Sequence, residues 1–418
     1  MTIGSGPAVP AATDLAGAIL AYRDLHTHPE LSGQEERTAA RLAASLTEAG
    51  AAVSTGIGGH GLVGVLANGA GPTVALRAEL DALAVREETG LPYAADGPVM
   101  HACGHDLHLA ALTATARTLT RCRESWRGTV LLIGQPAEET LTGAAAMVAD
   151  GLYDRFGRPD VVLAQHAAAL PAGMVAHAPP VPGQSVDSPI LAGSVTLRIA
   201  FTGAGGHAGA PHASVDPLLA ASATVVALQA VVARQVAPAE AAVLHVGRIE
   251  AGTGPNTLAD RAVLDVTARS TSTTTLERLV AATTRIARAE FAAAGGDGHP
   301  DVTVVSRSAV TDSDSATSDL VRRAHERYFG VSRMAWMPPS LSTEDIRDLC
   351  PDGIPLGYWM VGVIGPTEWN NATGSSLAEK INALPGNHSS RFAPDAKRSM
   401  STAVTALTSA ALAHLGEA

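Results

Sequence analysis

Short apolar runs, each bounded by glycine, proline or polar residues, recur along the first part of the chain. They lack the strict apolar–polar alternation of strands with one solvated face, and this favours strands that are buried on both faces. Four such strands are predicted, at residues 61–67, 73–78, 129–134 and 161–165. Segments of helical length accompany them, at residues 14–24, 34–49, 109–120 and 142–150. Strands that alternate with helices predict an α/β domain built on a central sheet.

The pattern changes in the middle of the chain. Residues 170–189 are rich in proline, glycine and alanine and are predicted to form a linker, while residues 1–12 are predicted to be disordered. The next elements are, in order, a strand, a helix, two strands, a helix and a strand, at residues 194–201, 216–234, 242–249, 262–269, 275–294 and 302–306. This order is that of a ferredoxin-like split βαβ domain. Beyond residue 311 the α/β pattern resumes, with helices at 318–328 and 396–415.

The expected fold class is therefore α/β, with an inserted domain. A mixed-sheet domain is expected in two parts, residues 1–186 and 311–418, and an α+β ferredoxin-like domain is expected between them at residues 187–310. The length of 418 residues independently favours two domains. An insertion of about 120 residues is of ordinary domain size.

The composition of the chain limits the kinds of binding partner and the cellular compartment that are expected. The net charge of −11 argues against a nucleic-acid partner, because phosphate binding needs a basic surface. The three cysteines do not suggest a disulfide framework, and they favour a reducing cytosol. Residues 1–13 lack the pattern of a signal peptide, and no apolar run approaches the roughly 20 residues that span a bilayer. A cytoplasmic protein with no membrane partner is expected.

The densest group of potential ligands is the stretch M-H-A-C-G-H-D-L-H at residues 100–108, which holds one thiol, three imidazoles and a carboxylate. Other candidates follow three of the predicted strands: Asp81 after the second, Glu138 and Glu139 after the third, and His166 after the fourth. Open α/β sheets place their active sites at the carboxyl ends of strands. We therefore expect these side chains to converge at one edge of the sheet.

The residue types favour a metal centre. Thiolate, imidazole and carboxylate together suit zinc or another late first-row divalent ion. The collected candidates are Cys103, His105, Glu138, Glu139, His166 and His388. With one of the two adjacent glutamates set aside as a general base, five ligands remain. Five ligands exceed one closed tetrahedral site, and they suit two ions about 3.5–4 Å apart that share a bridging ligand. A single structural zinc is the competing interpretation, and the distant origins of the ligands weaken it.

Side chains near such a site can have different roles. Neighbouring residues point in different directions, so one of the adjacent glutamates can bind metal while the other acts as a general base. Asp81 can orient an imidazole by hydrogen bonding. A metal-activated water beside a free carboxylate predicts hydrolysis of an amide or related bond. His26 and His28 are a further possible ligand pair, although histidines beside a proline turn are more often structural.

Six motifs carry a resemblance to a known family: H-T-H-P-E-L-S at 26–32, R-A-E-L-D-A-L at 77–83, M-H-A-C-G-H-D at 100–106, Q-P-A-E-E at 135–139, G-H-A-G-A-P-H at 206–212 and N-H-S at 387–389. The chain resembles the M20 metallopeptidase family, most closely its aminoacylase and amidohydrolase branch. That branch includes hippurate hydrolases, N-acyl-amino-acid amidohydrolases and hydrolases of indoleacetic acid conjugates. The cysteine of C-G-H-D is specific to it. Glu79 and Ala84 depart from the usual aspartate and proline of the branch, which affects the expected substrate preference and not the ligand set.

The resemblance implies a di-metal peptidase-like catalytic domain and assigns each ligand. Cys103 would bridge two metal ions. His105 and His166 would complete one metal site, and Glu139 and His388 would complete the other.

The resemblance also implies roles for residues that do not bind metal. Glu138 would be the general base, and Asp81 would orient a ligand. In relatives the inserted domain serves as a lid and makes the dimer, so His207 would reach the active site of the neighbouring subunit and stabilise the developing oxyanion. Asn256 and Arg269 would hold the substrate carboxylate.

The predicted function is hydrolysis of the amide bond of N-acyl amino acids or similar small conjugates. Two divalent metal ions are expected, with zinc first and manganese, cobalt or nickel as alternatives. Three other functions stay open: a dipeptidase or carboxypeptidase of the same fold, a non-catalytic metal-dependent binding protein, and a cysteine hydrolase with Cys103 as nucleophile. The presence of Glu138 argues against the binding protein, which has no need of a proton shuttle.

Overall fold

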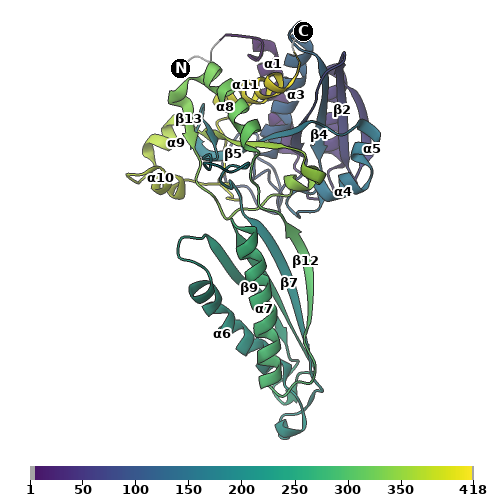
Figure 1. Ribbon diagram of the computed structural model, residues 1–418, viewed down its shortest axis with the longest axis vertical. Coiled ribbons are helices and arrows are strands. Elements are labelled where there is room, and N and C mark those ends of the chain that lie inside the picture. Colours follow the sequence, from purple (N-terminus) through teal and green to yellow (C-terminus); the bar gives the residue numbers. More distant parts are fainter. Residues whose placement is uncertain (1–4, 417–418) are drawn as a thin grey trace. The chain divides into compact units, whose positions relative to one another are not determined.

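The computed structural model describes residues 5–416, and the chain divides into two compact units (Figure 1). Unit 1 comprises the chain up to Ile190, the segment Asp312–Pro338 and the segment that begins at Asp345. Unit 2 comprises Leu191–Thr311 and Pro339–Glu344. In sequence, unit 2 is therefore one long and one short insertion into unit 1.

Unit 1 is built on an eight-stranded mixed sheet with the order β1-β2-β4-β3-β5-β14-β6-β13. Its strands are β1 (Ala52–Ile57), β2 (Gly61–Asn68), β3 (Thr73–Glu79), β4 (Gly128–Gln135), β5 (Val161–Pro171), β6 (Val175–His177), β13 (Met334–Trp336) and β14 (Leu356–Ile364). The four central strands β4, β3, β5 and β14 are parallel to one another, and β1 and β2 extend one side as antiparallel strands. The prediction of an α/β fold with a mixed sheet is confirmed.

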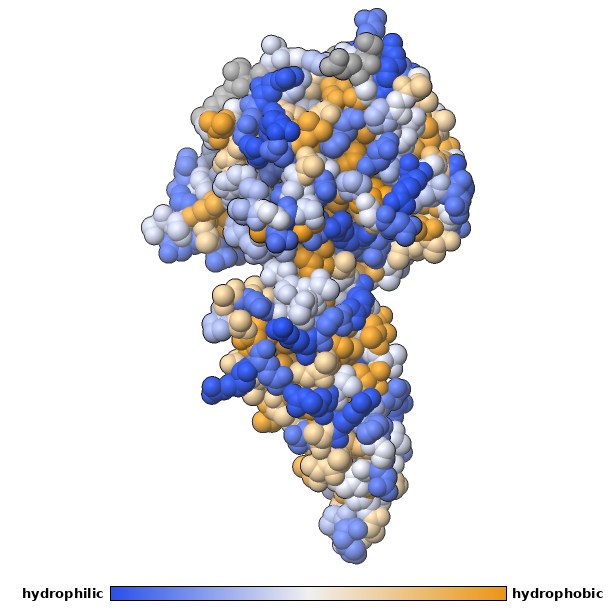
Figure 2. All heavy atoms as spheres, viewed as in Figure 1, coloured by the Kyte–Doolittle hydropathy of each residue, from blue (hydrophilic) through white to orange (hydrophobic). Residues whose placement is uncertain are grey.

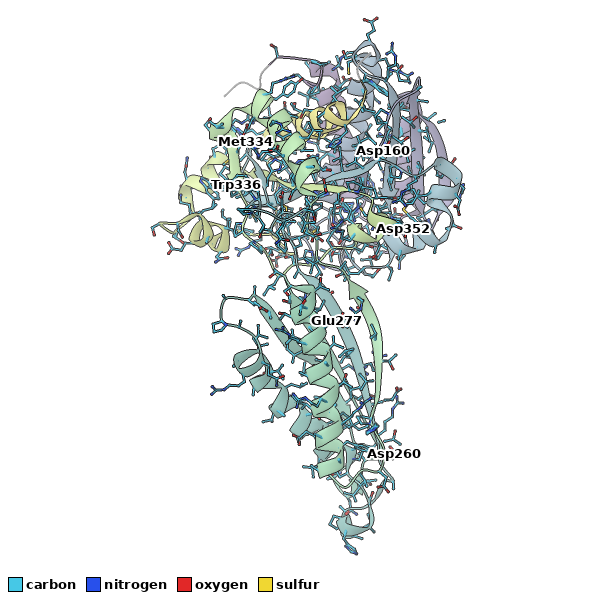
Figure 3. All side chains as sticks on the ribbon, viewed as in Figure 1. Asp160, Asp260, Glu277, Met334, Trp336 and Asp352 are labelled. Carbon is cyan, nitrogen blue, oxygen red and sulfur yellow. The ribbon has the colours of Figure 1, made fainter. Side chains whose placement is uncertain are left out.

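Asp160, labelled in Figure 3, aligns the starts of two central strands. Its carboxylate accepts a hydrogen bond from the Thr73 N–H at 2.7 Å, and its own N–H donates to the Thr73 carbonyl at 2.8 Å. Because β3 and β5 run parallel from this pair, they continue toward the same edge of the sheet. The residues that follow β3 and β4 and those in the second half of β5 can therefore meet there.

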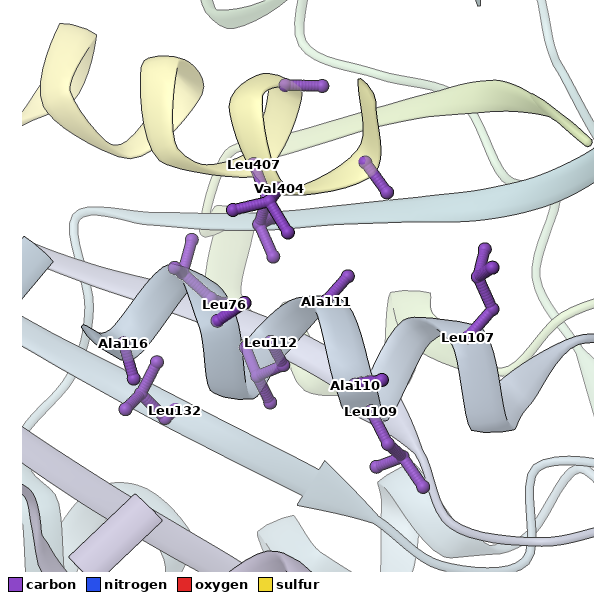
Figure 4. Close-up of a cluster of buried hydrophobic side chains, with 14 of the residues drawn as sticks. Leu76, Leu107, Leu109, Ala110, Ala111, Leu112, Ala116, Leu132, Val404 and Leu407 are labelled. Carbon is purple, nitrogen blue, oxygen red and sulfur yellow. The ribbon is translucent and has the colours of Figure 1, made fainter. Parts of the chain in front are cut away.

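Helices surround the sheet: α1 (Ala12–Thr27), α2 (Glu36–Glu48), α3 (His105–Arg121), α4 (Gly143–Ala149), α5 (Leu152–Phe156), α8 (Ser315–Phe329), α9 (Pro366–Asn371), α10 (Leu377–Ala383) and α11 (Ala396–His414). Helices α3 and α11 contact each other and form the centre of the core (Figure 4). Their facing positions hold small and aliphatic side chains, including Ala111, Val404 and Leu407, all of which are buried. Alanine at such positions lets the helix axes approach closely, and this fixes the first turn of α3, where His105 lies.

Several predictions for this unit are wrong in detail. Strand β5 does not stop before His166 but continues through it to Pro171, and the predicted linker at 170–189 contains strand β6. Helix α3 begins at His105, four residues before its predicted start. Strand β1 was not predicted. Of the predicted disordered segment 1–12, residues 1–4 lie outside the described residues, but Ala8 is fully buried. In each case tertiary contacts order residues whose local pattern is weak.

Unit 2 has a four-stranded antiparallel sheet with the order β12-β7-β11-β9 and a two-stranded pair of β8 with β10. Its elements are β7 (Gly193–Thr202), β8 (Gly206–His207), α6 (Pro217–Gln235), β9 (Ala242–Ala251), β10 (Thr257–Leu258), β11 (Arg261–Ser270), α7 (Thr273–Ala293) and β12 (Asp301–Ser308). Both helices pack on the sheet around a core that includes Phe201, Leu264 and Phe291. The order of the six long elements is the one that the sequence predicts for a ferredoxin-like domain.

Helix α6 carries an unusual number of exposed apolar side chains. Leu219 and Val226, seven residues apart on one face, are 56% and 74% exposed. Figure 2 shows apolar residues at the surface of both units. Among the described residues, α6 is the one helix whose length and composition alone would allow it to cross a membrane, with a third of the relevant window buried. The expectation that no apolar run approaches the length of a membrane span is therefore wrong for this segment.

Candidate metal centre

Asp81 lies two residues after the end of β3 and joins three segments of unit 1. Its Oδ2 accepts hydrogen bonds from the Ser32 hydroxyl at 2.7 Å and from the Glu139 N–H at 2.9 Å. The His105 Nδ1–H donates to the Asp81 main-chain carbonyl at 2.8 Å. The pKa of the Asp81 carboxyl is lowered despite its burial, because of His105 and the Glu139 N–H. The Asp81 carboxyl therefore stays ionised. The tautomer of His105 is fixed by the Asp81 main-chain carbonyl, whereas the sequence predicted that the carboxylate would orient an imidazole, and that role stays a prediction.

Cys103 and His105 flank a glycine that starts helix α3. Gly104 has φ of +88°, a conformation that favours glycine, and a Cβ built there would meet the Ala167 Cβ at 3.0 Å. The turn at this glycine places Cys103 before the helix and His105 at its first position. The Cys103 Sγ lies 3.5 Å from the Nε2 of His166, which projects from β5. Residues from two segments about 60 positions apart thus meet at one point.

The electrostatics of this group favour a thiolate. Burial opposes ionisation of Cys103, but the neighbouring His166 and His105 imidazoles hold the pKa of the thiol well below its ordinary value. Conversely, burial opposes protonation of His166, yet Cys103 raises the pKa of this imidazole to about 9. A cluster whose negative groups attract protons so strongly is also one that would attract a divalent cation.

Glu138 and Glu139 lie in a sharp turn after β4, where Ala137 adopts φ of +50°. Both carboxylates approach one imidazole nitrogen. Glu138 Oε2 lies 3.7 Å from the His105 Nε2, and Glu139 Oε1 lies 3.8 Å from the same atom. Burial and the Cys103 charge raise the pKa of Glu139. Both adjacent glutamates therefore lie beside His105, a candidate metal ligand.

His388 completes the group from the last loop before α11. Its Nε2 lies 3.3 Å from Glu139 Oε2, and its main-chain N–H donates to the Ala102 carbonyl at 2.8 Å. Interactions with Cys103 and Glu139 raise the pKa of His388 to about 10. The preceding Asn387 donates to the Cys103 carbonyl at 3.0 Å and to the Ala167 carbonyl at 3.1 Å. The sequence analysis did not predict these hydrogen bonds of Asn387, although this residue belongs to the N-H-S motif.

The residues present fit a metal centre. Among the described residues, three buried atoms of the group have no hydrogen-bond partner: Asp81 Oδ1, His105 Nε2 and Glu139 Oε1. Donor atoms of Cys103, His105 and Glu139 all lie within 4.8 Å of one another. Orphaned buried acceptors are costly unless something positively charged engages them. A thiolate, imidazoles and carboxylates are the donor set of zinc and similar ions.

Other candidate histidines have structural partners. His26 is fully buried, with Nδ1 2.7 Å from Asp106 Oδ2 and Nε2 3.2 Å from Glu87 Oε1, whereas His28 bonds the Asp24 carbonyl in the same helix. The structural interpretation of the His26 and His28 pair therefore fits this geometry better than the ligand interpretation. His101 is buried, and neither of its ring nitrogens has a hydrogen-bond partner among the described residues.

The three candidate substrate residues lie in unit 2. His207 is exposed in β8, where it pairs with Thr257, and the Asn256 carbonyl accepts the Ala208 N–H at 3.2 Å. Arg269 donates to the Leu341 carbonyl at 3.0 Å, within the same unit. Their roles toward substrate stay predictions.

A mixed sheet whose central strands are parallel, and beside whose strand ends a thiolate, imidazoles and carboxylates gather, is typical of α/β metallohydrolases. The chain belongs to peptidase family M20/M25/M40, whose model matches residues 75–383. Within that family it belongs to the aminoacylase and amidohydrolase branch, as the motifs predicted, and it is an enzyme that acts on amide bonds.

Two relatives and one solved structure support this assignment. The chain is 33% identical over 363 residues to N-acetyl-L-cysteine deacetylase of Bacillus subtilis (strain 168), covering 84% of this chain and 81% of that protein. It is 38% identical over 265 residues to hippurate hydrolase of Campylobacter jejuni subsp. jejuni serotype O:2, covering 63% of this chain and 67% of that protein. The structure of the Bacillus subtilis YXEP protein, a dinuclear metal binding peptidase from the M20 family, matches with a TM-score of 0.75 at 25% identity, over 96% of this chain and 98% of that one.

Proposed function

We propose that this protein hydrolyses the amide bond of N-acyl amino acids or similar small conjugates with the help of two divalent metal ions, zinc in the first instance. The observation that carries the proposal is the placement of Glu138 and Glu139. Both carboxylates approach the His105 Nε2 to within 4 Å, and Glu139 Oε2 also lies 3.3 Å from His388 Nε2. Two carboxylates beside one candidate ligand support a division of tasks, in which Glu139 would bind metal and Glu138 would transfer protons.

The donor set can be divided between two ions that share one ligand. Cys103 would be shared, His105 and His166 would hold one ion, and Glu139 and His388 would hold the other. The interactions that support this division are the Cys103–His166 and Glu139–His388 contacts. Bound ions would lower the pKa of a coordinated water toward about 7 and polarise the scissile carbonyl.

The protein's own groups would then move the protons. Glu138 Oε2 would take a proton from the attacking water and return it to the leaving nitrogen, so that amide and water become a carboxylate and an amine. Asp81 holds the Nδ1–H of His105 through its carbonyl and keeps the Nε2 lone pair facing the site. The site is almost closed to solvent at Glu138, which is 5% exposed, and this strengthens each charge interaction within it.

The names of two relatives support the proposed substrate class. One relative is named as a deacetylase of N-acetyl-L-cysteine and another as a hydrolase of hippurate, and both substrates are N-acyl amino acids. Arg269 and Asn256 would hold the substrate carboxylate. His207, contributed by a second subunit, would stabilise the developing oxyanion.

A homodimer through the inserted domain, residues 187–310, is part of this proposal. Its support is the exposed apolar face of α6, which includes Leu219 and Val226, and the position of β9 at an open edge of the unit 2 sheet. Sedimentation of the full chain tests it: Val226→Glu should shift a dimer toward monomer. We also propose that the protein does not bind nucleic acid, since its net charge is −11. A cytoplasmic location without membrane binding is proposed as well, and the small, odd number of cysteines supports a reducing compartment.

The decisive experiment is turnover of a panel of N-acetyl, N-benzoyl and long-chain acyl amino acids, together with dipeptides, with metal removed and added back. We expect hydrolysis of acyl amino acids that stops on chelation and returns with metal. Glu138→Gln should lower kcat by about 10²–10⁴-fold while metal stays bound. Activity that survives chelation would point instead to Cys103 as a nucleophile, and preferred turnover of dipeptides would point to a dipeptidase.

A further inference from the structure

We propose that His108 is a positioning residue that sets the orientation of His166 through the main chain of β5, and that it does not bind metal itself. This inference rests on the proposed metal site and assigns a task to a buried side chain that the catalytic scheme does not use. His108 lies one turn after His105 on α3 and is 3% exposed.

Both ring nitrogens of His108 are engaged within the protein. The Ala167 N–H donates to Nε2 at 2.8 Å, and Nδ1 lies 2.7 Å from Glu79 Oε2. Because Nε2 accepts a main-chain hydrogen bond, the proton of the neutral ring must sit on Nδ1, which donates it to Glu79. The lone pair that a metal ion would need is therefore already in use.

Glu79 is itself held rigidly. Its other oxygen forms an ion pair with Arg77, and Arg77 Nε donates to Gln135 Oε1 at 2.8 Å. Gln135 in turn donates to Asp345 Oδ1 at 2.6 Å. These side chains are buried and come from neighbouring strands β3 and β4 and from the segment that begins at Asp345. A chain of charge-assisted hydrogen bonds thus fixes Glu79, the partner of His108 Nδ1.

His108 contacts Ala167, the residue next to the candidate ligand His166. Ala167 gives its N–H to His108, and its carbonyl accepts from His166 Nδ1 at 2.9 Å and from Asn387 at 3.1 Å. With Nδ1 occupied in this way, His166 presents Nε2 to Cys103. The His108 ring also packs against the His166 ring, with centroids 4.7 Å apart, and near the His105 ring at 5.7 Å.

The competing interpretation makes His108 a ligand. Donor atoms of Glu79, His105, His108 and His166 all lie within 4.8 Å of one another, which is compatible with a metal cluster. A metal at His108 Nε2 would displace the Ala167 N–H and leave that buried donor unpaired. The two interpretations differ in what a side chain at position 108 must supply: an acceptor for a main-chain N–H, or an imidazole.

The test uses two amides of different length in the full-length protein. In His108→Gln the longer side chain can place its carbonyl oxygen near the position of Nε2 and accept the Ala167 N–H. In His108→Asn the shorter amide can reach Glu79 but leaves Ala167 without an acceptor. The matched control is His325→Asn, which removes another buried histidine, one that bonds His177 and the Ala406 carbonyl. For each protein, bound Zn²⁺ is measured by equilibrium dialysis and stability by thermal melting.

We expect wild type, His108→Gln and His325→Asn to bind two ions each, and His108→Asn to bind one of them about 10–100-fold more weakly. This pattern of Zn²⁺ binding is expected even if all three variants have a lower melting temperature. Equal metal loss in both position-108 variants would overturn the inference in favour of a ligand role, and wild-type affinity in His108→Asn would overturn it as well. A wild-type protein that binds no ion would instead overturn the proposed function, and this inference with it.

Discussion

The Nδ1–H of His105 donates to the main-chain carbonyl of Asp81 at 2.8 Å, while the Asp81 carboxylate accepts the N–H of Glu139. One residue just after β3 therefore orients an imidazole with its carbonyl and a glutamate with its side chain. Both partners are candidate metal ligands. The geometry of the site thus depends on a residue that need not contact the metal.

Replacement of Asp81 should weaken metal binding. Asp81→Ala removes the acceptor for the Glu139 N–H and the Ser32 hydroxyl, and we expect metal affinity to fall by about 10–100-fold. Asp81→Asn keeps one acceptor oxygen and should lose less. Competition with a chromophoric chelator measures both variants, and equal affinities for Asp81→Ala and wild type would remove Asp81 from this role.

Substitution of Gly104 should disturb the ligands on either side of it. Alanine at φ of +88° costs about 1–2 kcal/mol in the backbone, and its Cβ would also meet the Ala167 Cβ at 3.0 Å. We expect Gly104→Ala to lower the free energy of unfolding and to weaken metal binding through shifts of Cys103 and His105.

Gly151 is the matched control for this variant. It also precedes a helix, with φ of +80°, but the nearest atom to its added Cβ lies at 3.7 Å. Gly151→Ala should therefore pay the backbone cost alone and keep normal metal binding. Urea unfolding of the metal-free proteins and metal titration of the native ones measure the two effects separately. Comparable metal loss in both variants would contradict the steric argument.

The buried His26 should make stability fall at alkaline pH. Burial opposes its protonation, but Asp106 and Glu87 raise the pKa of His26 to about 10. A folded-state pKa above the unfolded value of about 6.5 stabilises the native state fully below that value, and the stabilisation is lost as pH rises toward 10. Tyr22, Tyr93 and His101 also lie near these charges; the pKa values of both tyrosines are raised and that of His101 is lowered to about 4.

The measurement is the difference in unfolding free energy between wild type and His26→Gln across pH 6–10 without metal. Near pH 6.5 the variant should be less stable by about 3–5 kcal/mol, because two buried carboxylates lose their cation. The difference should shrink as pH rises. Taking the difference removes the titration of groups common to both proteins, such as His166 and His388. A difference that is independent of pH would show that His26 is neutral in the native state.

Local sequence determined much of this protein. Apolar runs of strand length predicted β2, β3 and β4 within a residue or two, and the order of elements predicted the architecture of unit 2. Residue chemistry singled out Asp81, Glu139 and His388 as candidates, and the folded chain brings them together with Cys103 and His105. This was possible because burial imposes its own periodicity on strands and helices, and because few residue types can bind a metal ion.

Only the tertiary structure decided which neighbour each polar group meets. Nothing in the local pattern distinguishes His108, held between Glu79 and the Ala167 N–H, from the candidate ligand His105 three residues earlier. The continuation of β5 through His166 likewise depends on pairing with β14, nearly 200 residues away in sequence. Hydrogen bonds act over about 3 Å, so their partners are fixed by strand register and helix packing, which a chain acquires only when it folds.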